Sequence, residues 1–273
     1  MSEIRFQLLW YEFVISTADA AVADALAYVV QDARQDLPVA ETVRLRVDRE
    51  GPGFVVSEVG SARVFAERDV DVVDVVYSRV HTAAFAHASR EGWVRAHAAV
   101  ADLGPTRVLL VGASGVGKTS LSMRLLLDGV EVQGDESVLL RDGIALPVPR
   151  PFHLKEGVEA VVPEVAPMLP GLPTVPATPP VRAFHPSLVA AWRTTMAPVA
   201  HLVLLERGDE TVCEELEAVE AMHDVVQGVF WLHEPKATVI REIAWILRSA
   251  RCHRVVMHDV ADAASIVRGL GAS

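Results

Sequence analysis

Cysteine is scarce in this chain of 273 residues, which contains only Cys213 and Cys252. Two cysteines form neither a disulfide framework nor a zinc motif, and we interpret both as small buried side chains. The sequence also lacks an uncharged apolar run near the roughly 18 residues that a membrane helix needs. The apolar stretch at residues 6–16 contains Gln7 and Glu12, which a signal peptide would not. These absences predict a reduced, cytoplasmic protein that is not inserted in a membrane.

Positive charge is also in short supply, because 25 Lys and Arg residues face 36 Asp and Glu residues and leave a net charge of -11. Such a chain repels nucleic-acid phosphates and anionic membranes, so both are poor candidate partners. Lysine occurs only as Lys118, Lys155 and Lys236. Each lysine is therefore a candidate for a specific role, although a codon bias toward arginine explains the ratio equally well. Hydrophobic residues make up 51% of the chain, enough for the core of one large or two small domains.

Residues 1–90 are predicted to form an accessory α+β domain. Apolar and polar residues alternate over residues 42–65 with glycines between the segments, which predicts a small antiparallel meander. A helical stripe of apolar residues runs from Val72 to Ala83, with Asp69 and Asp71 ahead of it as capping residues. This region carries no chemical motif, and residues 91–273 are predicted to form the second domain.

Residues 93–101 and 107–111 are predicted to be antiparallel strands, because the turn between them is too short for a parallel crossover. This pairing places His97 opposite Val111 or Gly112. The other predicted elements are a helix at 118–128, a strand at 130–132, a hairpin at 138–146, strands at 201–206 and 254–258, and helices at 216–229, 236–250 and 261–270.

The segment Gly112-Ala113-Ser114-Gly115-Val116-Gly117-Lys118-Thr119 matches the phosphate-binding pattern GxxxxGK[ST]. An apolar strand precedes it and a helix follows it, which is the context that this loop requires. Its backbone N–H groups are expected to bind phosphates, Lys118 to reach the β and γ oxygens, and the Thr119 hydroxyl to bind Mg²⁺. The predicted cofactors are therefore ATP and Mg²⁺, and the predicted nucleotide-binding residues are Gly112, Ser114, Gly115, Val116, Gly117, Lys118, Thr119 and Ser120.

The sequence beyond this loop narrows the class of nucleotide-binding protein. A GTPase would carry an Asn-Lys-x-Asp motif to read the base, and the chain contains no asparagine. A motor-type ATPase would end a buried strand with a catalytic carboxylate, a position that Glu206 could fill. An ordinary strand followed by the turn at residues 207–209 is the better interpretation of Glu206.

Asp135 and Glu136 follow the strand after the phosphate loop's helix, so the chain returns them to the phosphate end of the sheet. Together with Thr119, they are predicted to bind Mg²⁺, and Asp135 can accept the proton of an attacking hydroxyl. A solvated acidic turn is the alternative. His97 reaches the same loop through its antiparallel strand, and its alternative role is that of a buried structural histidine.

Arg150 and Lys155 flank a proline-fixed segment after the hairpin. They are predicted to stabilise the transferred phosphoryl group or the acceptor, unless they are only surface charges on a loop. Seven of the sixteen prolines lie in the next stretch, residues 161–181, which predicts an irregular loop. We expect this proline-rich loop either to border the acceptor groove or to act as a passive linker.

These motifs resemble, in order and spacing, the C-terminal domain of HPr kinase/phosphorylase. The resemblance rests on His97-Ala98-Ala99, the loop at residues 112–119, Gly134-Asp135-Glu136 and residues 150–155, and it covers residues 93–157. The chain resembles even more closely the HPr-kinase-like proteins found beside peptide natural-product genes. The resemblance implies an α/β P-loop kinase core of the phosphoenolpyruvate carboxykinase-like type, with a mixed sheet and flanking helices. It also implies that Asp135 is the base toward a serine hydroxyl and that His97 lies near the γ-phosphate.

The chain departs from this family's pattern at several positions. Thr119 keeps the metal-binding hydroxyl of the family's serine, but Ser120 stands where the family has a glutamate, which removes a metal ligand. Glu136 replaces an aspartate, and the glycine-rich segment associated with phosphorolysis is absent.

The sequence as a whole predicts an ATP-dependent kinase that phosphorylates a Ser/Thr-type hydroxyl on a small protein or peptide. The alternatives are a nucleotide-binding regulatory or scaffold protein without transfer activity, and a small-molecule kinase. The sequence leaves open the identity of the acceptor and whether the chain forms a homo-oligomer.

Overall fold

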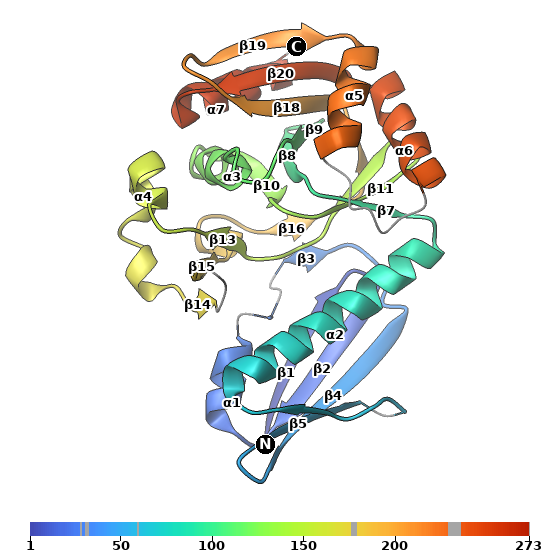
Figure 1. Ribbon diagram of the computed structural model, residues 1–273, viewed down its shortest axis with the longest axis vertical. Coiled ribbons are helices and arrows are strands. Elements are labelled where there is room, and N and C mark those ends of the chain that lie inside the picture. The colour runs from blue at the N-terminus through green and yellow to red at the C-terminus, as the bar shows by residue number, and fades with distance from the viewer. Residues whose placement is uncertain (28, 31–32, 59, 176–178, 229–235, 273) are drawn as a thin grey trace.

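The computed structural model describes residues 1–27, 29–30, 33–58, 60–175, 179–228 and 236–272. Figure 1 shows a sheet-and-helix unit at the N-terminal end of the molecule and a larger α/β core at the opposite end, where the C-terminus lies. Among the described residues, no helix combines the length and the apolar character needed to cross a membrane.

The N-terminal unit is built on a sheet with the strand order β1-β2-β4-β5-β6. The meander predicted for residues 42–65 is confirmed, because β4, β5 and β6 pair antiparallel in sequence. The sequence did not predict the hairpin of β1 and β2, which joins this sheet by parallel pairing of β2 with β4. The strands are β1 (Ser2–Leu8), β2 (Tyr11–Thr17), β4 (Glu41–Glu50), β5 (Gly53–Glu58) and β6 (Val64–Ala66).

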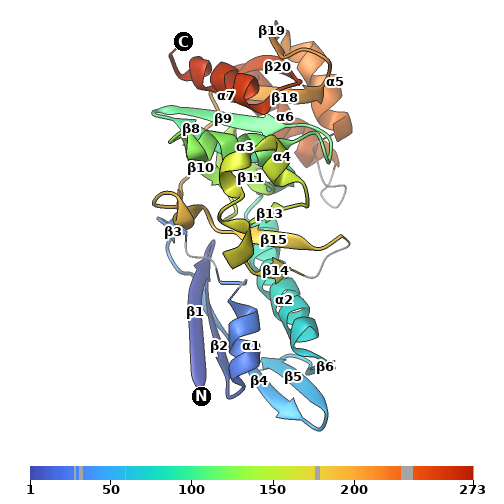
Figure 2. The same ribbon diagram turned by 90° about the vertical axis from the view of Figure 1, so that its left-hand side faces the viewer.

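Helices α1 (Ala20–Leu26) and α2 (Asp69–Arg90) pack against this sheet (Figures 1 and 2). The prediction that Asp69 and Asp71 precede the helix as caps is wrong, because Arg68 is the N-cap residue of α2 and both aspartates lie in its first turn. Asp71 still supports this end of the helix, since its carboxylate accepts a hydrogen bond from the backbone N–H of Arg68 at 3.0 Å. The buried core of this unit extends to Leu139 and Leu146 of the next sheet. The apolar core therefore crosses residue 90, and the division into domains 1–90 and 91–273 stays a prediction.

A four-stranded antiparallel sheet, in the order β17-β12-β11-β7, follows the N-terminal unit. The predicted hairpin at residues 138–146 is confirmed, with Asp142 (φ 51°) and Gly143 (φ 79°) at its turn. Both central residues of such a turn need positive φ, which an Asp-Gly pair tolerates. The strands are β7 (Val94–Ala96), β11 (Val138–Arg141), β12 (Ile144–Pro147) and β17 (Ala197–Pro198).

The prediction of one continuous strand over residues 93–101 is wrong. The structure divides it into β7, which pairs with β11, and β8 (Ala99–Leu103), which pairs with β9 (Thr106–Val111) in a different sheet. The predicted antiparallel pairing of the second half is confirmed, with Ala99 opposite Leu110. His97 lies at the break between the two sheets.

The C-terminal core is a six-stranded mixed sheet in the order β10-β8-β9-β18-β20-β19. Its central strands β9, β18 and β20 are parallel, and the outer pairs are antiparallel. One face packs against α3 and α7, and the other against α5 and α6. This arrangement confirms the predicted α/β class with a mixed sheet and flanking helices. The remaining elements of the core are β10 (Glu131–Gly134), β18 (His201–Arg207), β19 (Val212–Leu216), β20 (Arg251–Met257), α3 (Lys118–Leu127), α5 (Ala218–Gly228), α6 (Lys236–Ser249) and α7 (Val260–Gly269).

Three predictions about the C-terminal half need correction. Cys213 is exposed on β19, whereas Cys252 is buried as predicted. Leu216 ends β19 and does not begin a helix, since α5 starts at Ala218; Val229 lies outside the described residues. The proline-rich stretch 161–181 is not wholly irregular. It contains short 3-10 turns at Pro163–Val165 and Leu169–Gly171, where proline stands in the first turn and needs no amide partner.

A small sheet borders this proline-rich stretch. Strand β15 (Val181–Phe184) pairs antiparallel with both β13 (Phe152–Leu154) and β14 (Thr174–Val175), and the short helix α4 (Val158–Val161) precedes the stretch. Residues 176–178 lie outside the described part of the chain. The pairing of β13 with β15 attaches the proline-rich stretch to the segment that carries His153 and Lys155.

Candidate active site

The phosphate loop joins β9 to α3, with the helix beginning at Lys118. Gly117 has φ +109°, and a Cβ atom there would lie 2.7 Å from the Met257 Cε atom. A Cβ atom at Gly112 would lie 2.7 Å from the backbone oxygen of Leu205. The loop therefore needs glycine at both positions, for its backbone conformation and for its close approach to the neighbouring strands.

Lys118 lies under this loop and is only 5% exposed. Its ammonium group donates hydrogen bonds to the backbone oxygens of Gly112, at 2.7 Å, and Ala113, at 3.2 Å. Burial lowers the pKa of this ammonium group, and the nearby carboxylates Glu136 and Asp135 act in the opposite direction. A lysine desolvated in this way is a strong partner for a phosphate oxygen.

Asp135 follows β10 and meets the first turn of α3. The Thr119 hydroxyl donates a hydrogen bond to Asp135 Oδ2 at 2.8 Å. The other oxygen, Asp135 Oδ1, is buried and has no hydrogen-bond partner among the described residues. Burial raises the pKa of Asp135 to about 6, and Arg150 and the Thr119 hydroxyl oppose the rise. One oxygen of this carboxyl group is thus hydrogen-bonded to Thr119, and the other has no hydrogen-bond partner among the described residues.

Glu136 connects the next two predicted site residues. His97 Nδ1 donates to the backbone oxygen of Glu136 at 3.0 Å and lies 3.6 Å from its carboxylate oxygen Oε1. The guanidinium of Arg150 lies 3.6 Å from the same oxygen. Burial, followed by the charge of Lys118, lowers the pKa of His97. The imidazole is therefore held through Nδ1 in a fixed orientation, with Nε2 as its other polar atom.

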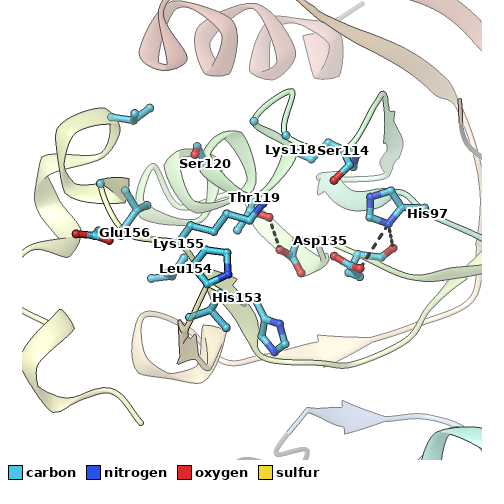
Figure 3. A pocket seen from close by; sticks show the side chains of 18 of the residues that line it. His97, Ser114, Lys118, Thr119, Ser120, Asp135, His153, Leu154, Lys155 and Glu156 are labelled. Carbon is cyan, nitrogen blue, oxygen red and sulfur yellow. Dashed lines mark hydrogen bonds and ion pairs between the residues drawn. The ribbon is translucent and has the colours of Figure 1, made fainter. Parts of the chain in front are cut away.

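The opposite wall comes from β13 and the residues after it. Arg150 Nη2 donates to His153 Nδ1 at 2.9 Å, and burial together with Arg150 lowers the pKa of His153 to about 3, so this imidazole is neutral. Lys155 is exposed, and its charge contributes to the lowered pKa of Lys118. Figure 3 shows the Lys155 side chain extending toward Thr119 and Asp135.

One cavity of 470 Å³ brings most of the predicted residues together (Figure 3). Val116 is an exception, because its side chain packs in the apolar core, and Gly112 contributes its backbone oxygen to Lys118. No cluster of three or more His, Cys, Asp or Glu side chains suited to a metal occurs in the part of the chain that the structure describes. The predicted site residues that line the cavity are His97, Ser114, Gly115, Gly117, Lys118, Thr119, Ser120, Asp135, Glu136, Arg150 and Lys155.

Arg207 also lines the cavity, and the sequence analysis missed it. It ends β18, the parallel neighbour of β9, and its Nη2 atom would lie 2.9 Å from a Cβ atom at Gly117. The preceding residue Glu206 forms an ion pair with Arg254 at 3.0 Å and is absent from the cavity wall. Strand alternation therefore presents the arginine to the phosphate loop and directs Glu206 toward Arg254.

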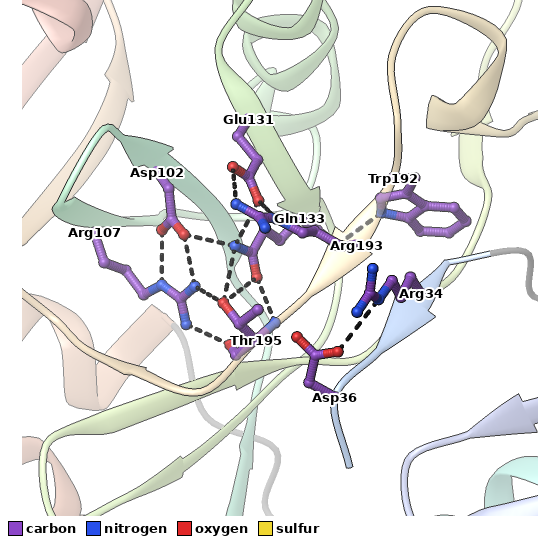
Figure 4. A network of polar contacts seen from close by, with 9 residues as sticks. All are labelled: Arg34, Asp36, Asp102, Arg107, Glu131, Gln133, Trp192, Arg193 and Thr195. Carbon is purple, nitrogen blue, oxygen red and sulfur yellow. Dashed lines mark hydrogen bonds and ion pairs between the residues drawn. The ribbon is translucent and has the colours of Figure 1, made fainter.

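A buried polar network supports the strand that leads to Asp135 (Figure 4). Arg107, 1% exposed, forms a bidentate ion pair with Asp102 through two bonds of 2.8 Å. It also donates to the backbone oxygens of Ala145 and Thr195, each at 2.7 Å. Gln133 on β10 donates to Asp102 and accepts from the backbone N–H of Thr195 at 2.8 Å. These bonds fix β10 two residues before Asp135.

The N-terminal unit reaches the same network. Strand β3 (Arg34–Gln35) pairs in parallel with β16 (Arg193–Thr194), and Trp192 donates its indole N–H to the backbone oxygen of Gln133 at 3.1 Å. Arg193 also forms an ion pair with Glu131 of β10 at 2.7 Å. Strand β3 of the N-terminal unit and residues 192–194 therefore meet beside the strand that leads to Asp135.

Comparison with known proteins finds likeness to solved structures. No model of a known protein family matches the chain, and no curated protein matches it in sequence. Its fold is similar to the solved structure of the HPr(Ser) kinase/phosphatase from Coxiella burnetii, with 12% identity and a TM-score of 0.36. The match covers 64% of this chain and 87% of that one. A likeness of this size does not by itself establish a family.

Proposed function

We propose that the protein is an ATP-dependent, Mg²⁺-requiring kinase that transfers a phosphoryl group to a Ser/Thr-type hydroxyl of a small protein or peptide. One observation carries the proposal: the Thr119 hydroxyl is hydrogen-bonded to Asp135, whose second oxygen is buried without a partner, in the cavity that also holds Lys118. Phosphoryl transfer needs positioned phosphates, charge neutralisation and a base, and these residues can supply all three.

The residues fit ATP and Mg²⁺. Thr119, Asp135 and Glu136 offer hard oxygen donors, and Mg²⁺ takes few protein ligands because phosphates and water complete its shell. The backbone N–H groups at residues 114–119 and the α3 N-terminus suit the phosphates. When bound, Mg²⁺ would neutralise charge on the β- and γ-phosphate oxygens.

Each remaining side chain has a defined task in this proposal. Burial raises the pKa of Asp135 and makes its carboxylate more basic, and the buried Oδ1 atom, which has no hydrogen-bond partner among the described residues, can accept the acceptor's proton. Lys118 and Lys155 approach the cavity from opposite walls and hold the phosphates. Arg150 and His97 fix Glu136 at the end of the cavity where the γ-phosphate would lie.

The peptide or protein nature of the acceptor rests on the sequence resemblance of residues 93–157. It is tested by supplying γ-labelled ATP with separate pools of Ser/Thr-containing peptides, free hydroxy amino acids and sugars. We expect label in the peptide pool alone, and none when alanine replaces serine and threonine. Label confined to the amino acid or sugar pool would make the protein a small-molecule kinase.

A nucleotide-binding regulatory protein without transfer activity is the second candidate function. Ser120 favours it, because this position carries a possible metal ligand in the family that the sequence resembles. MgATP binding with no labelled product in any pool would support this candidate.

A further inference from the structure

The cavity beside the phosphate loop is lined by two chemically different kinds of residue. Its wall holds the charged and polar groups already described. The cavity wall also includes five apolar residues, which we name the apolar lobe: Leu154, Val158, Val161, Pro179 and Val181. Strand β13, which ends at Leu154, pairs with β15, which begins at Val181. Leu154, Val158 and Val181 are at most 8% exposed, and we call these three buried side chains the floor of the lobe, whereas Val161 is 41% exposed and Pro179 is also exposed. Exposed apolar side chains at a cavity wall lose water contact when a ligand covers them.

The phosphate loop fixes the direction in which a nucleotide would lie. Lys118 and the metal-binding hydroxyl of Thr119 mark the β- and γ-phosphates in such loops. Asp135 and Ser120 lie on opposite sides of Thr119 (Figure 3). The γ-phosphate belongs on the side of Asp135, so the α-phosphate and the nucleoside leave on the side of Ser120.

The apolar lobe adjoins this Ser120 side. Leu154 and Glu156 lie on that side of Thr119 in Figure 3, and Ser120 lines the same cavity as Val158 and Val161. A chain of three phosphates anchored at Lys118 therefore directs its nucleoside toward the lobe. A planar base with apolar faces matches a wall made of valine, leucine and proline side chains.

We propose that the apolar lobe is the subsite for the donor's nucleobase, which lies between the floor of the lobe and the exposed side chains of Val161 and Pro179. This inference rests on the proposed function. It assigns the proline-rich stretch to the donor base in place of the acceptor groove, and it leaves the Glu136 and Arg150 end of the cavity for the acceptor. Binding energy then comes from both the triphosphate and the apolar faces of the base.

Calorimetric titration with MgATP and with magnesium tripolyphosphate separates the contribution of the triphosphate from that of the nucleoside, because tripolyphosphate has neither ribose nor base. Variants of the lobe then test the part that belongs to the base. We expect wild-type protein to bind MgATP about tenfold or more tightly than tripolyphosphate. Val161→Ser should weaken the binding of MgATP about threefold, because the variant loses part of the apolar contact made by two methyl groups. The affinity for tripolyphosphate should stay unchanged. Val161→Ser/Pro179→Ser should weaken MgATP about tenfold. Val219→Ser, at a valine that is 83% exposed on α5, is the matched control and should match wild type.

Equal wild-type affinities for the two ligands would overturn the assignment, as would a loss on Val161→Ser that affects both ligands alike. If Val161→Ser left the MgATP affinity unchanged and raised the KM for the peptide acceptor, the lobe would bind the acceptor, and the assignment to the base would be refuted. These results leave the proposed function standing. Wild-type protein that binds neither ligand would refute the proposed function itself, and the base subsite with it.

Discussion

Arg107→Met should destabilise the protein strongly, because it removes one partner of a buried ion pair. All the hydrogen-bonding contacts of the Arg107 guanidinium go to Asp102, Ala145 and Thr195, and its side chain is 1% exposed. Breaking a buried pair from one side costs about 3–5 kcal/mol. Asp102 is 16% exposed and keeps its bond from Gln133, so we expect a loss near the lower limit, about 3 kcal/mol.

Urea unfolding at neutral pH measures this loss, with Arg44→Met as the control at an exposed arginine of β4. The control should stay within about 0.5 kcal/mol of wild type. In Arg107→Met/Asp102→Leu the carboxylate is no longer left unpaired, so the double variant should lose less than the sum of the two single variants. Additive losses, or an Arg107→Met variant as stable as wild type, would refute the reasoning.

Two further predictions concern ionisable groups. Asp135→Asn should preserve MgATP binding and slow single-turnover transfer about a hundredfold or more, which is the usual contribution of a positioned general base. Glu136→Gln should slow transfer less. Equal losses of rate for the two variants in rapid-quench measurements would contradict this division of roles. Burial lowers the pKa of His81 from its ordinary value of 6.5 to about 4, and the hydrogen bond to the backbone oxygen of Tyr77 opposes this shift. The unfolded chain therefore binds more protons between these values, and stability falls as pH drops through them, by about 3 kcal/mol in full and about 2 kcal/mol from pH 7.5 to 5. His81→Phe should reduce the acid-induced loss by that amount in urea unfolding at the two pH values, and an unchanged loss would show that His81 does not titrate as described.

The sequence predicted those parts of the site that depend on local pattern. The loop at residues 112–119, the helix after it and the short strand before Asp135 follow one another along the chain. Their spacing alone indicated that Asp135 returns to the phosphate end, and the structure places Asp135 beside Thr119. The Asp142-Gly143 turn could likewise be predicted from adjacent residues alone.

The missed features depend on which distant segments become neighbours. Arg207 lines the cavity only because β18 pairs with β9, and no pattern around residue 207 indicates that pairing. The break at His97 arises because β7 and β8 find partners in different sheets, although the sequence is apolar on both sides. The apolar run at residues 6–16 does not alternate clearly between apolar and polar residues, which is the usual pattern of a strand. The reason is that β1 and β2 meet there in a hairpin and both strands bury side chains.

Single-turnover transfer with wild type and Lys118→Ala tests the central claim most directly. Enzyme in excess over γ-labelled ATP, with Mg²⁺ and the Ser/Thr peptide pool, should place the label on an acceptor hydroxyl within one turnover. Lys118→Ala should remain folded by circular dichroism, bind MgATP more weakly and give no labelled peptide, because Lys118 is expected to act on the β- and γ-phosphates. Transfer by Lys118→Ala at a rate near that of wild type would contradict the account, as would wild-type protein that binds MgATP and never labels an acceptor.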